Sequence, residues 1–378
     1  MPEVDDVVLA ATASLFQGCI NYEGINHIPA PQVIFGGNDI PGRHMKSLQR
    51  NLLISLYDAW TFPDNFGNEW PWIPIAPIDS EPLARANVQK MGNAYKVIAM
   101  SKWGKEVMIR EGIREEIISY IPHMVDTNVY RPPVDKKEAK RSLGFPEDCF
   151  LVGMVARTTK TMPANRKGYA EAFEAMAPFM SRHDNVRLYC HAPPYMGEDS
   201  ADLPGMANMF GVPWDKCRAL DAYAEMMGIP DQQMAEIYGA FDVYFAPSAG
   251  EGFNVPLIEA QACGVPVIAN DTSAQSENTD LKSGWLVKPK THIVTPLNSK
   301  WEVASPFGQD STCEKCQHVT HSPGLLDALE EAYEKLGNKD ALKKVVKSTR
   351  KFATDFDVQT VATRYWRPFI QEISKELA

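Results

Sequence analysis

Short apolar runs alternate with helical stretches along most of the chain from about residue 95 onward. Six runs have the length of strands, at residues 95–100, 117–121, 150–156, 186–190, 243–247 and 265–269. The segments between them that are predicted to be helical are residues 103–111, 168–180, 231–240 and 256–263. Most of the strand-like runs are continuously apolar, which is typical of strands buried on both faces. The pattern therefore predicts an α/β fold with a parallel sheet and crossover helices.

The alternation is interrupted in two places. Residues 131–148 hold prolines and five basic residues without a strand-like run, which predicts a linker with a short surface helix. Residues 291–323 are polar and contain prolines, which predicts a long loop or insertion. Apolar spacing then predicts three helices, at residues 325–336, 342–349 and 358–377, the last with a kink at Pro368.

Composition narrows the class of protein. With 378 residues, 44% of them hydrophobic, the chain can bury full cores in two or three domains. The net charge of −10 argues against a nucleic-acid partner. No apolar run approaches the roughly 18 residues of a membrane span, and the acidic first residues do not form a secretory signal. The seven scattered cysteines suit reduced thiols, so we expect a cytoplasmic protein without integral membrane insertion.

The segment PSAGEGFNVPLIEAQACGVPVIAND, at residues 247–271, carries the most chemical information. A buried strand ends in a loop that contains Gly250 and Gly252. Pro256 suits the first position of a helix, and Gly264 can end that helix in the left-handed conformation. The helix N-terminus therefore faces a glycine-bearing loop at the carboxyl end of a parallel strand. Open α/β sheets bind ligands there, and unpaired N–H groups favour phosphate.

Two carboxylates, Glu251 and Glu259, belong to the same unit. Because a carboxylate repels phosphate, Glu259 is better suited to accept hydrogen bonds from ribose hydroxyls. Glu251, ahead of the helix, would face the group that follows the phosphates. Together they predict a nucleotide whose terminal group bears hydroxyls, such as a nucleotide sugar. The alternative is that both acids only favour the helix N-terminus electrostatically.

The pair of acids with seven residues between them, within EGFNVPLIEAQACGVPVIA, resembles the E-x7-E element of retaining GT-B glycosyltransferases of family 4. Further segments resemble this family in the right order: PIDSEPL, SKWGKEVMIREGI, YIPHMVDTNVYRP, VGMVARTTKTMPANRKGYAEAF and LYCHAPP. The resemblance implies two Rossmann-like domains with parallel sheets facing across a cleft. The parts expected are an acceptor-side domain at residues 1–135, a nucleotide-sugar-binding domain at 136–355 and a returning C-terminal helix at 356–378.

The resemblance also implies roles for individual residues. Arg157 and Lys167 would bind the donor diphosphate, with Arg166 as a close rival, and Glu259 would bind the ribose. Glu251 would hold the transferred sugar. The backbone expected to help is at Gly252, Phe253, Asn254 and Val255. No cofactor or metal is expected, and the acceptor could be a saccharide, a lipid or a protein.

The N-terminal part departs from the family in two respects. The family's first domain usually opens with a glycine-rich loop after its first strand, but here only Gly18 and, later, Gly36-Gly37 are present. We therefore expect a shortened or truncated first domain. Where the family often has His-Asp, this chain has Tyr57-Asp58. Asp58 follows a buried strand and is a candidate for the reaction centre or, alternatively, a turn residue.

Other signals admit a structural interpretation. The aromatic residues between Trp60 and Trp72 either stack on a sugar or lipid acceptor or, as we favour, pin a loop to the core. Cys313, Cys316, His318 and His321 are spaced too tightly for a zinc finger, and coincidence is favoured. Asp355-Phe356-Asp357 matches a D-x-D motif but follows no strand. His123 and His191 follow strands and could line the cleft or be structural. The basic residues on one predicted helix, Lys343, Lys344, Lys347, Arg350 and Lys351, are expected to form a solvated face, with peripheral membrane contact as the alternative.

Two other functions stay open. One is a nucleotide-sugar-binding or partner-binding protein of the same fold with little catalysis, which the Tyr57 departure favours. The other is a nicotinamide-dependent oxidoreductase, but no G-x-G-x-x-G motif follows a strand in this chain.

Overall fold

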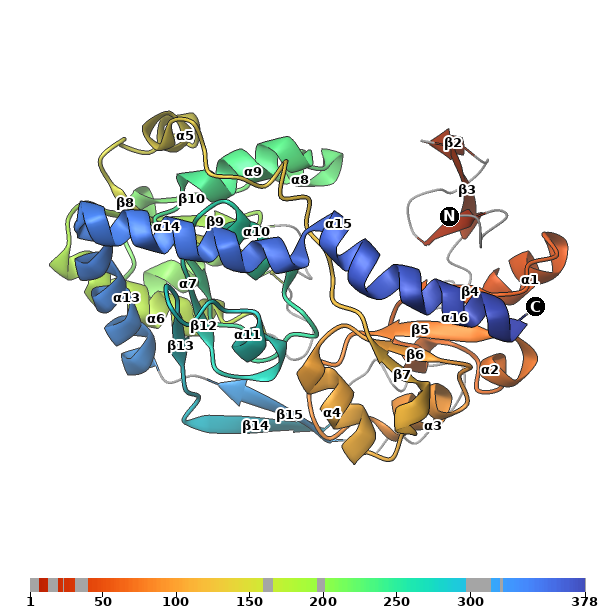
Figure 1. Cartoon of the computed structure of the whole chain (residues 1–378). Helices are drawn as coiled ribbons and strands as arrows, with labels where there is room; N and C mark the ends of the chain where they lie inside the picture. The colour runs from red at the N-terminus through yellow and green to blue at the C-terminus, as the bar shows by residue number, and fades with distance from the viewer. Residues whose placement is uncertain are drawn as a thin grey trace. The chain divides into compact units, whose positions relative to one another are not determined.

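The computed structural model describes residues 7–12, 20–22, 24–30, 40–158, 166–195, 201–296, 314–319 and 322–377. Contacts divide the chain into two compact units (Figure 1). The first comprises Met1–Pro122, Pro296–Lys315 and Ala362–Ala378, and the second His123–Thr295 and Cys316–Val361. The domain boundaries expected at residues 135 and 355 stay predictions.

The first unit is built on a four-stranded parallel sheet in chain order: β4 (Leu53–Leu56), β5 (Trp72–Ala76), β6 (Val97–Ala99) and β7 (Ile118–Tyr120). The helices that connect these strands are α2 (Phe66–Glu69), α3 (Arg85–Gly92) and α4 (Lys102–Arg110). Trp72, Val97 and Met108 are at most 1% exposed in its core. Continuous apolar runs thus form buried strands here, as the sequence predicts.

A smaller sheet precedes this one. Its strands are β1 (Val8–Thr12), β2 (Ile20–Tyr22) and β3 (Ile25–Ala30), and helix α1 (Ile40–Ser47) follows. β1 and β3 are parallel, but β2 is antiparallel to β3, so the first unit is not purely parallel. Gly18, Gly36 and Gly37 lie outside the described residues. The shortening of the N-terminal domain therefore stays a prediction.

The second unit holds a six-stranded sheet, and its neighbouring strands are all parallel. In spatial order the strands are β10 (Cys217–Ala219), β9 (Val186–His191), β8 (Phe150–Val155), β11 (Val243–Ala246), β12 (Val267–Asn270) and β13 (Trp285–Val287). The chain runs outward from β8 to β10 and then returns to begin again at β11. The strand order therefore reverses between β8 and β11, which is where doubly wound sheets open a crevice for ligands.

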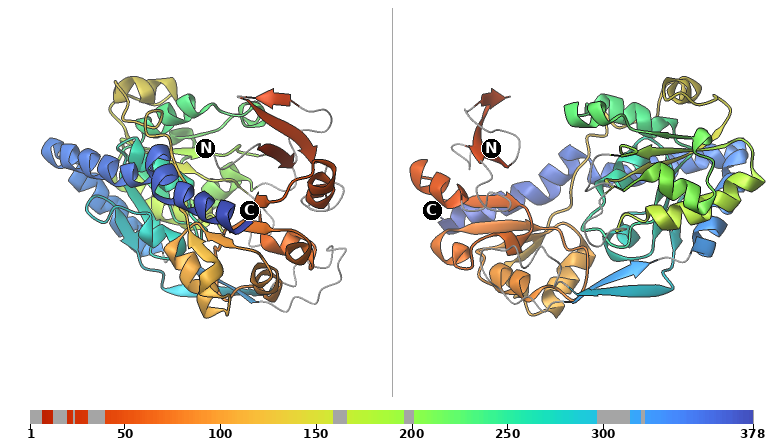
Figure 2. Two further views of the ribbon diagram at one scale, coloured as in Figure 1. Left: turned by 45° about the vertical axis from the view of Figure 1, so that its right-hand side comes forward. Right: turned by 180° about the vertical axis from the view of Figure 1, so that it is seen from behind.

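Helices cover both faces of this sheet (Figures 1 and 2). One face packs against α6 (Tyr169–Arg182), α7 (Leu203–Phe210) and α13 (Ser322–Gly337). The other carries α9 (Asp231–Ala240) and α10 (Val255–Ala262), with α14 (Lys339–Ala353) packed on α10. The shorter helices are α5 (Lys136–Ser142), α8 (Ala222–Met227), α11 (Ser273–Glu277) and α15 (Val358–Val361). Within the described part of the chain, no helix is both long and apolar enough to cross a bilayer.

Two expectations about local structure are wrong. The loop expected at residues 291–323 contains β14 (Thr291–Pro296) and β15 (Glu314–Val319), which pair with each other, because THIVTP has the β-branched composition of a strand. The kink expected at Pro368 lies instead at a π-helical segment, Ala362–Trp366, before α16 (Arg367–Leu377). Pro368 is the second residue of α16 and cannot donate a helical hydrogen bond, so the irregularity falls in the turn before it.

Candidate active site

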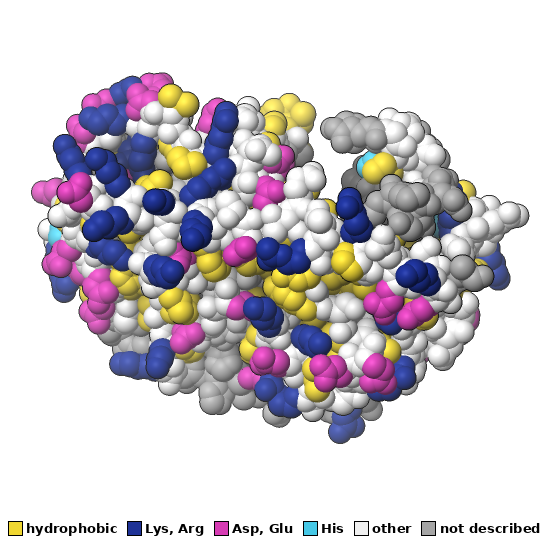
Figure 3. All heavy atoms as spheres, viewed as in Figure 1, with side chains coloured by type: hydrophobic (Ala, Val, Ile, Leu, Met, Phe, Trp, Pro, Cys, Tyr) yellow, Lys and Arg dark blue, Asp and Glu magenta, His cyan; other side chains and the backbone are white. Residues whose placement is uncertain are grey.

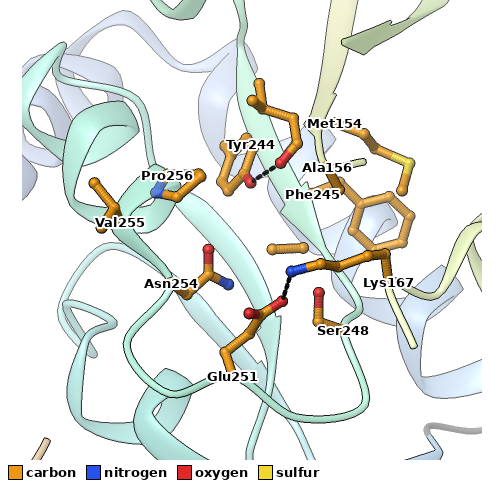
Figure 4. Close-up of a pocket in the computed structure, with 12 residues that line it drawn as sticks. Met154, Ala156, Lys167, Tyr244, Phe245, Ser248, Glu251, Asn254, Val255 and Pro256 are labelled. Atoms are coloured by element: carbon orange, nitrogen blue, oxygen red, sulfur yellow. Dashed lines mark hydrogen bonds and ion pairs between the residues drawn. The ribbon is translucent and has the colours of Figure 1, made fainter. Parts of the chain in front are cut away.

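A cavity of about 170 Å³ lies at the carboxyl ends of β8 and β11, where the strand order reverses (Figure 4). Pocket volumes for small molecules are typically about 300–1,000 Å³, so this cavity can take only part of a nucleotide sugar. Its floor is the end of the sheet, where the Tyr244 hydroxyl donates to the carbonyl oxygen of Val155 at 3.1 Å. The lining residues are Met154, Val155, Ala156, Lys167, Tyr244, Phe245, Ala246, Ser248, Glu251, Asn254, Val255 and Pro256.

One carboxylate and two cations meet at the mouth of this cavity. The Lys167 ammonium donates to Glu251 Oε1 at 2.5 Å, and a guanidinium nitrogen of Arg166 lies 3.3 Å from Glu251 Oε2 (Figure 4). The same Arg166 nitrogen donates to the carbonyl oxygen of Gly250 at 2.8 Å. Glu251 is only 8% exposed, and a carboxylate buried to that degree requires such partners.

Gly168 explains how the two cations reach the loop of Glu251. Its φ of +73° belongs to the left-handed region, and a Cβ there would lie 2.2 Å from the carbonyl oxygen of Pro247. Only glycine allows the Arg166–Lys167 turn to pack this closely on the end of β11. Gly168 also caps α6, which leads away from the site.

The N-terminus of α10 borders the cavity as the sequence predicts. Asn254 adopts a left-handed conformation, with φ +68°, and Val255 and Pro256 begin the helix and line the cavity. Phe253 is 3% exposed and packs edge-on against His123, with ring centroids 5.2 Å apart. The structure thus brings Lys167, Asn254 and Val255 to one cavity, and Arg166 contacts Glu251, which also lines it.

Glu259 does not line the cavity. Its carboxylate accepts a hydrogen bond of 2.7 Å from the Tyr238 hydroxyl. Burial raises the pKa of Glu259, and hydrogen bonds from Tyr238 and Tyr130 oppose that rise. The predicted contact of Glu259 with a ribose stays a prediction.

Arg157 and Asp58 are not among the described residues that line the cavity. Arg157 is exposed at the end of β8, and Arg166, its rival, is the arginine that contacts Glu251. Asp58 belongs to the first unit, where it follows β4 and its carbonyl accepts a hydrogen bond from the Thr61 hydroxyl at 2.6 Å. That contact is typical of a turn residue, and the role of Asp58 at the reaction centre stays a prediction.

The two histidines are partly buried in the second unit. Nδ1 of His191 lies 3.1 Å from the Tyr189 hydroxyl, and burial lowers its pKa to about 4. Burial also lowers the pKa of His123. Both rings are therefore favoured in their neutral form at pH 7.

The structural interpretation of the D-x-D motif and of the aromatic cluster is confirmed. Phe62, Phe66 and Trp72 are buried and contact one another. Asp357 accepts a 2.6 Å hydrogen bond from the Thr127 hydroxyl, so its carboxylate is engaged within the fold. Cys313 and His321 lie outside the described residues, and within the described parts no cluster of metal-ligating side chains occurs.

The prediction of a solvated basic face is confirmed for four of the five residues. Exposed Lys343, Lys344, Lys347 and Lys351 lie on α14, where basic side chains gather among carboxylates (Figure 3). Arg350 points inward instead and donates to three backbone carbonyls, at Thr127, Tyr130 and Ala262.

Comparison with known proteins shows which proteins this architecture resembles. Residues 150–295 match the family model described as glycosyl transferases, group 1. The sucrose-phosphate synthase of Thermosynechococcus elongatus has a TM-score of 0.71 at 18% identity over 98% of this chain and 89% of that one. Anabaena Alr3699/HepE in complex with UDP-glucose has a TM-score of 0.63 at 16% identity, over 93% and 86%. These likenesses show that the chain has the GT-B fold.

Curated relatives of this GT-B chain are glycosyltransferases by name. The D-inositol 3-phosphate glycosyltransferase of Corynebacterium urealyticum is 23% identical over 303 residues, which are 70% of this chain and 66% of that protein. The lipopolysaccharide core biosynthesis mannosyltransferase LpsB of Rhizobium meliloti is 31% identical over 160 residues, 42% and 41% of the two chains. The chain thus spans less than two thirds of the length of these relatives.

Sequence reasoning missed several residues of this GT-B site. Tyr244 and Ser248 line the cavity, and buried amides at Asn270, Gln275 and Asn278 support its loop. The signal available was the run of polar residues that directly follows the apolar strand 265–269. Amide side chains directly after a strand are as typical of a buried hydrogen-bond network as of an exposed loop, so this run of residues does not by itself indicate burial.

Proposed function

We propose that this chain is a retaining glycosyltransferase that moves a sugar from a nucleotide-sugar donor to an acceptor. The observation that carries the proposal is the meeting of Lys167, Arg166 and Glu251 at the reversal of strand order, beside the N-terminus of α10. Relatives named as glycosyltransferases, and a solved neighbour described in complex with UDP-glucose, support the same reaction class.

In this proposal the donor diphosphate binds the cations. Cleavage of a sugar from a nucleoside diphosphate leaves growing negative charge on the leaving phosphate. Lys167, Arg166 and Arg157 would stabilise that charge together with the N–H groups that begin α10. Glu259 would bind the ribose, and Glu251 with the backbone from Gly252 to Val255 would hold the sugar. The cavity of about 170 Å³ would take only a part of such a donor.

The proposal assigns no metal ion or organic cofactor to this chemistry, because protein cations supply the charge. The acceptor is a saccharide, a lipid or a protein that meets the first domain, where Asp58 is the candidate at the reaction centre. A cytoplasmic location is also part of the proposal, since reduced thiols persist there. The described cysteines that are free and buried are Cys149, Cys190, Cys217 and Cys263.

A ligand panel tests this function. UDP-, GDP- and ADP-sugars are added to the full chain, and the melting temperature is measured with and without a chelator. A ligand at 100 times its Kd stabilises by about 2.7 kcal/mol, which is readily detected. Release of nucleoside diphosphate from the best donor then reports turnover, and the anomeric configuration of the product by NMR reports retention. A chain that binds no nucleotide sugar overturns the proposal.

The alternative is a binding protein of the same fold with little catalysis. Tyr57, in place of the family His, favours it, because a phenol with an ordinary pKa of about 10 is a poor proton donor and acceptor at neutral pH. Burial and the charge of Asp58 both raise the pKa of Tyr57. Calorimetric binding of a nucleotide sugar without turnover, and a gain of turnover in Tyr57→His, would favour this alternative over the enzyme.

A further inference from the structure

Buried amide side chains hold the loop that carries Glu251. This loop, residues 247–254, is called here the Glu251 loop, and the amides lie at the end of β12 and just after it in the chain. Asn270, Gln275 and Asn278 are each at most 1% exposed. Their amide nitrogens donate to carbonyl oxygens of the loop: Asn270 to Pro247 at 3.1 Å and to Ser248 at 2.9 Å, Gln275 to Ser248 at 2.9 Å, and Asn278 to Phe253 at 2.5 Å.

Gln275 alone among these amides joins both sides of the loop. Its Nε2 donates to the carbonyl oxygen of Ser248, and its Oε1 accepts from Asn254 Nδ2 at 3.2 Å. Ser248 and Asn254 flank Glu251 in the chain, and all three line the cavity (Figure 4). The backbone N–H of Glu251 donates to the Ser273 hydroxyl at 3.0 Å, which ties the middle of the loop to the same segment.

Burying an amide side chain has a free-energy cost that burying an apolar side chain does not have. Desolvation of an amide costs about 1–3 kcal/mol unless its hydrogen bonds are made, whereas an apolar side chain of similar size costs nothing of this kind. Gln275 is fully buried, and the bonds described here go to two residues of the cavity wall. Its geometry therefore points to a role in fixing that wall.

We propose that Gln275 is a positioning residue for the sugar-binding part of the site. It acts through Ser248 and Asn254 and so sets the direction in which the Glu251 carboxylate enters the cavity. This inference rests on the proposed function for its effect on transfer. The diphosphate is held by cations on another segment, Arg166 and Lys167, so loss of Gln275 affects the sugar more than the diphosphate.

Gln261 provides a matched control. It is a glutamine of the same unit and is also fully buried. Its amide donates to the carbonyl oxygens of Leu257 and Asn278 at 2.8 Å each and accepts from the N–H of Asp280 at 2.8 Å. None of these bonds is made to the Glu251 loop itself, and the bond to Asn278 goes to its backbone carbonyl, not to the side-chain amide that holds Phe253. Gln261→Met therefore removes a comparable buried network without releasing the cavity wall.

The test compares Gln275→Met and Gln261→Met in the full chain, at temperatures where circular dichroism shows both to be folded. We expect Gln275→Met to lower kcat by roughly 10- to 100-fold, as a misplacement of about 1 Å does. The Kd of the nucleoside diphosphate should stay within roughly threefold of wild type. Gln261→Met should lower the melting temperature and leave kcat unchanged. If Gln275→Met does not fold, Gln275→Asn takes its place, since it buries no charge and its shorter amide cannot span Ser248 and Asn254.

Hydrogen exchange separates this inference from the proposed function. Gln275→Met should speed amide exchange in residues 247–254, and Gln261→Met should not. If the wild type neither binds nor turns over a nucleotide sugar, the proposed function fails while this comparison still decides whether Gln275 fixes the loop. Equal exchange and equal kcat in wild type and Gln275→Met overturn the inference, as does an equal loss of kcat in Gln261→Met.

Discussion

The ammonium of Lys167 lies 2.5 Å from the carboxylate of Glu251. Arg166 contacts the other carboxylate oxygen, so two of the three cations proposed for the diphosphate are paired with the acid proposed for the sugar. Under the proposed function, an arriving diphosphate would compete with Glu251 for these cations and would free its carboxylate for the sugar hydroxyls.

Glu251→Gln should therefore separate binding from transfer. The amide cannot hold the cations as an ion pair, and it removes a negative charge that repels the diphosphate. We expect the Kd of the nucleoside diphosphate to fall by roughly three- to tenfold and transfer to be lost. Isothermal titration and product release measure the two effects. Glu236→Gln, an exposed acid on α9, should change neither. Weaker diphosphate binding in Glu251→Gln would show that the carboxylate does not compete.

The opposite change, at Lys167, should weaken binding. Lys167→Ala removes the cation that points into the cavity (Figure 4), so the diphosphate loses a charge-assisted contact. We expect its Kd to rise by roughly tenfold or more and transfer to be abolished while the fold stays intact by circular dichroism. Wild-type transfer rates in both Lys167→Ala and Glu251→Ala would contradict the site assignment.

Gly168→Ala should damage the site through the backbone alone. The new Cβ would meet the carbonyl oxygen of Pro247 at 2.2 Å, so the turn with Arg166 and Lys167 must move. Gly211→Ala is the control, because Gly211 has a φ of +79° but nothing within 4 Å of its Cβ position. In both variants the alanine must adopt the left-handed backbone conformation, which destabilises the fold by about 1 kcal/mol. Only Gly168→Ala should also lose diphosphate affinity in the titration, and equal affinities would refute the steric argument.

The second unit follows from its sequence because its strands are buried on both faces. Residues 150–156 and 243–247 are continuously apolar, and β8 and β11 occupy nearly the same positions. Pro256 and Gly264 bracket a helix that spans Val255–Ala262. Local signals and tertiary burial agree in these segments, which is the condition for a reliable prediction.

The remaining features of the site depend on contacts between residues that are far apart in the sequence. The sequence favours Arg157, with Arg166 as a close rival, whereas the packing of Gly168 on Pro247 brings Arg166 to Glu251. Gln275 has the sequence signature of a loop amide, and its burial is visible only when β12 lies beside β11. Polar residues satisfied by distant backbone groups are therefore the part of this site that sequence patterns miss.

His191 should make the stability of the chain depend on pH. Burial lowers its pKa from 6.5 to about 4, so the unfolded chain binds a proton in this interval that the folded chain does not. Its contribution is therefore complete above pH 6.5 and is lost as the pH falls to about 4. We expect a loss of roughly 3 kcal/mol from this group. Urea denaturation at pH 7.5, 5.5 and 4.5 should show a shallower pH dependence for His191→Gln, and identical slopes would contradict the assignment.

Arg350 should contribute more to the free energy of unfolding than its basic neighbours on α14 do. Its guanidinium donates to the carbonyl oxygen of Ala262, the last residue of α10, at 2.9 Å, and to those of Tyr130 and Thr127. Without the guanidinium, these three carbonyl oxygens lose a hydrogen-bond donor. The substitution also removes a positive charge from the C-terminus of α10, the helix that begins at the cavity. We expect Arg350→Met to lower the free energy of unfolding by roughly 2–4 kcal/mol.

Two further variants decide whether geometry or charge is responsible. Arg350→Lys keeps the charge, but a single ammonium cannot span the three carbonyls, so it should recover less than half of the loss. Lys351→Met, at an exposed position on the same helix, should stay within about 0.5 kcal/mol of wild type. Urea denaturation at pH 7 measures all three. If Arg350→Met and Lys351→Met are equally stable, Arg350 belongs with the solvated face and does not hold the end of α10.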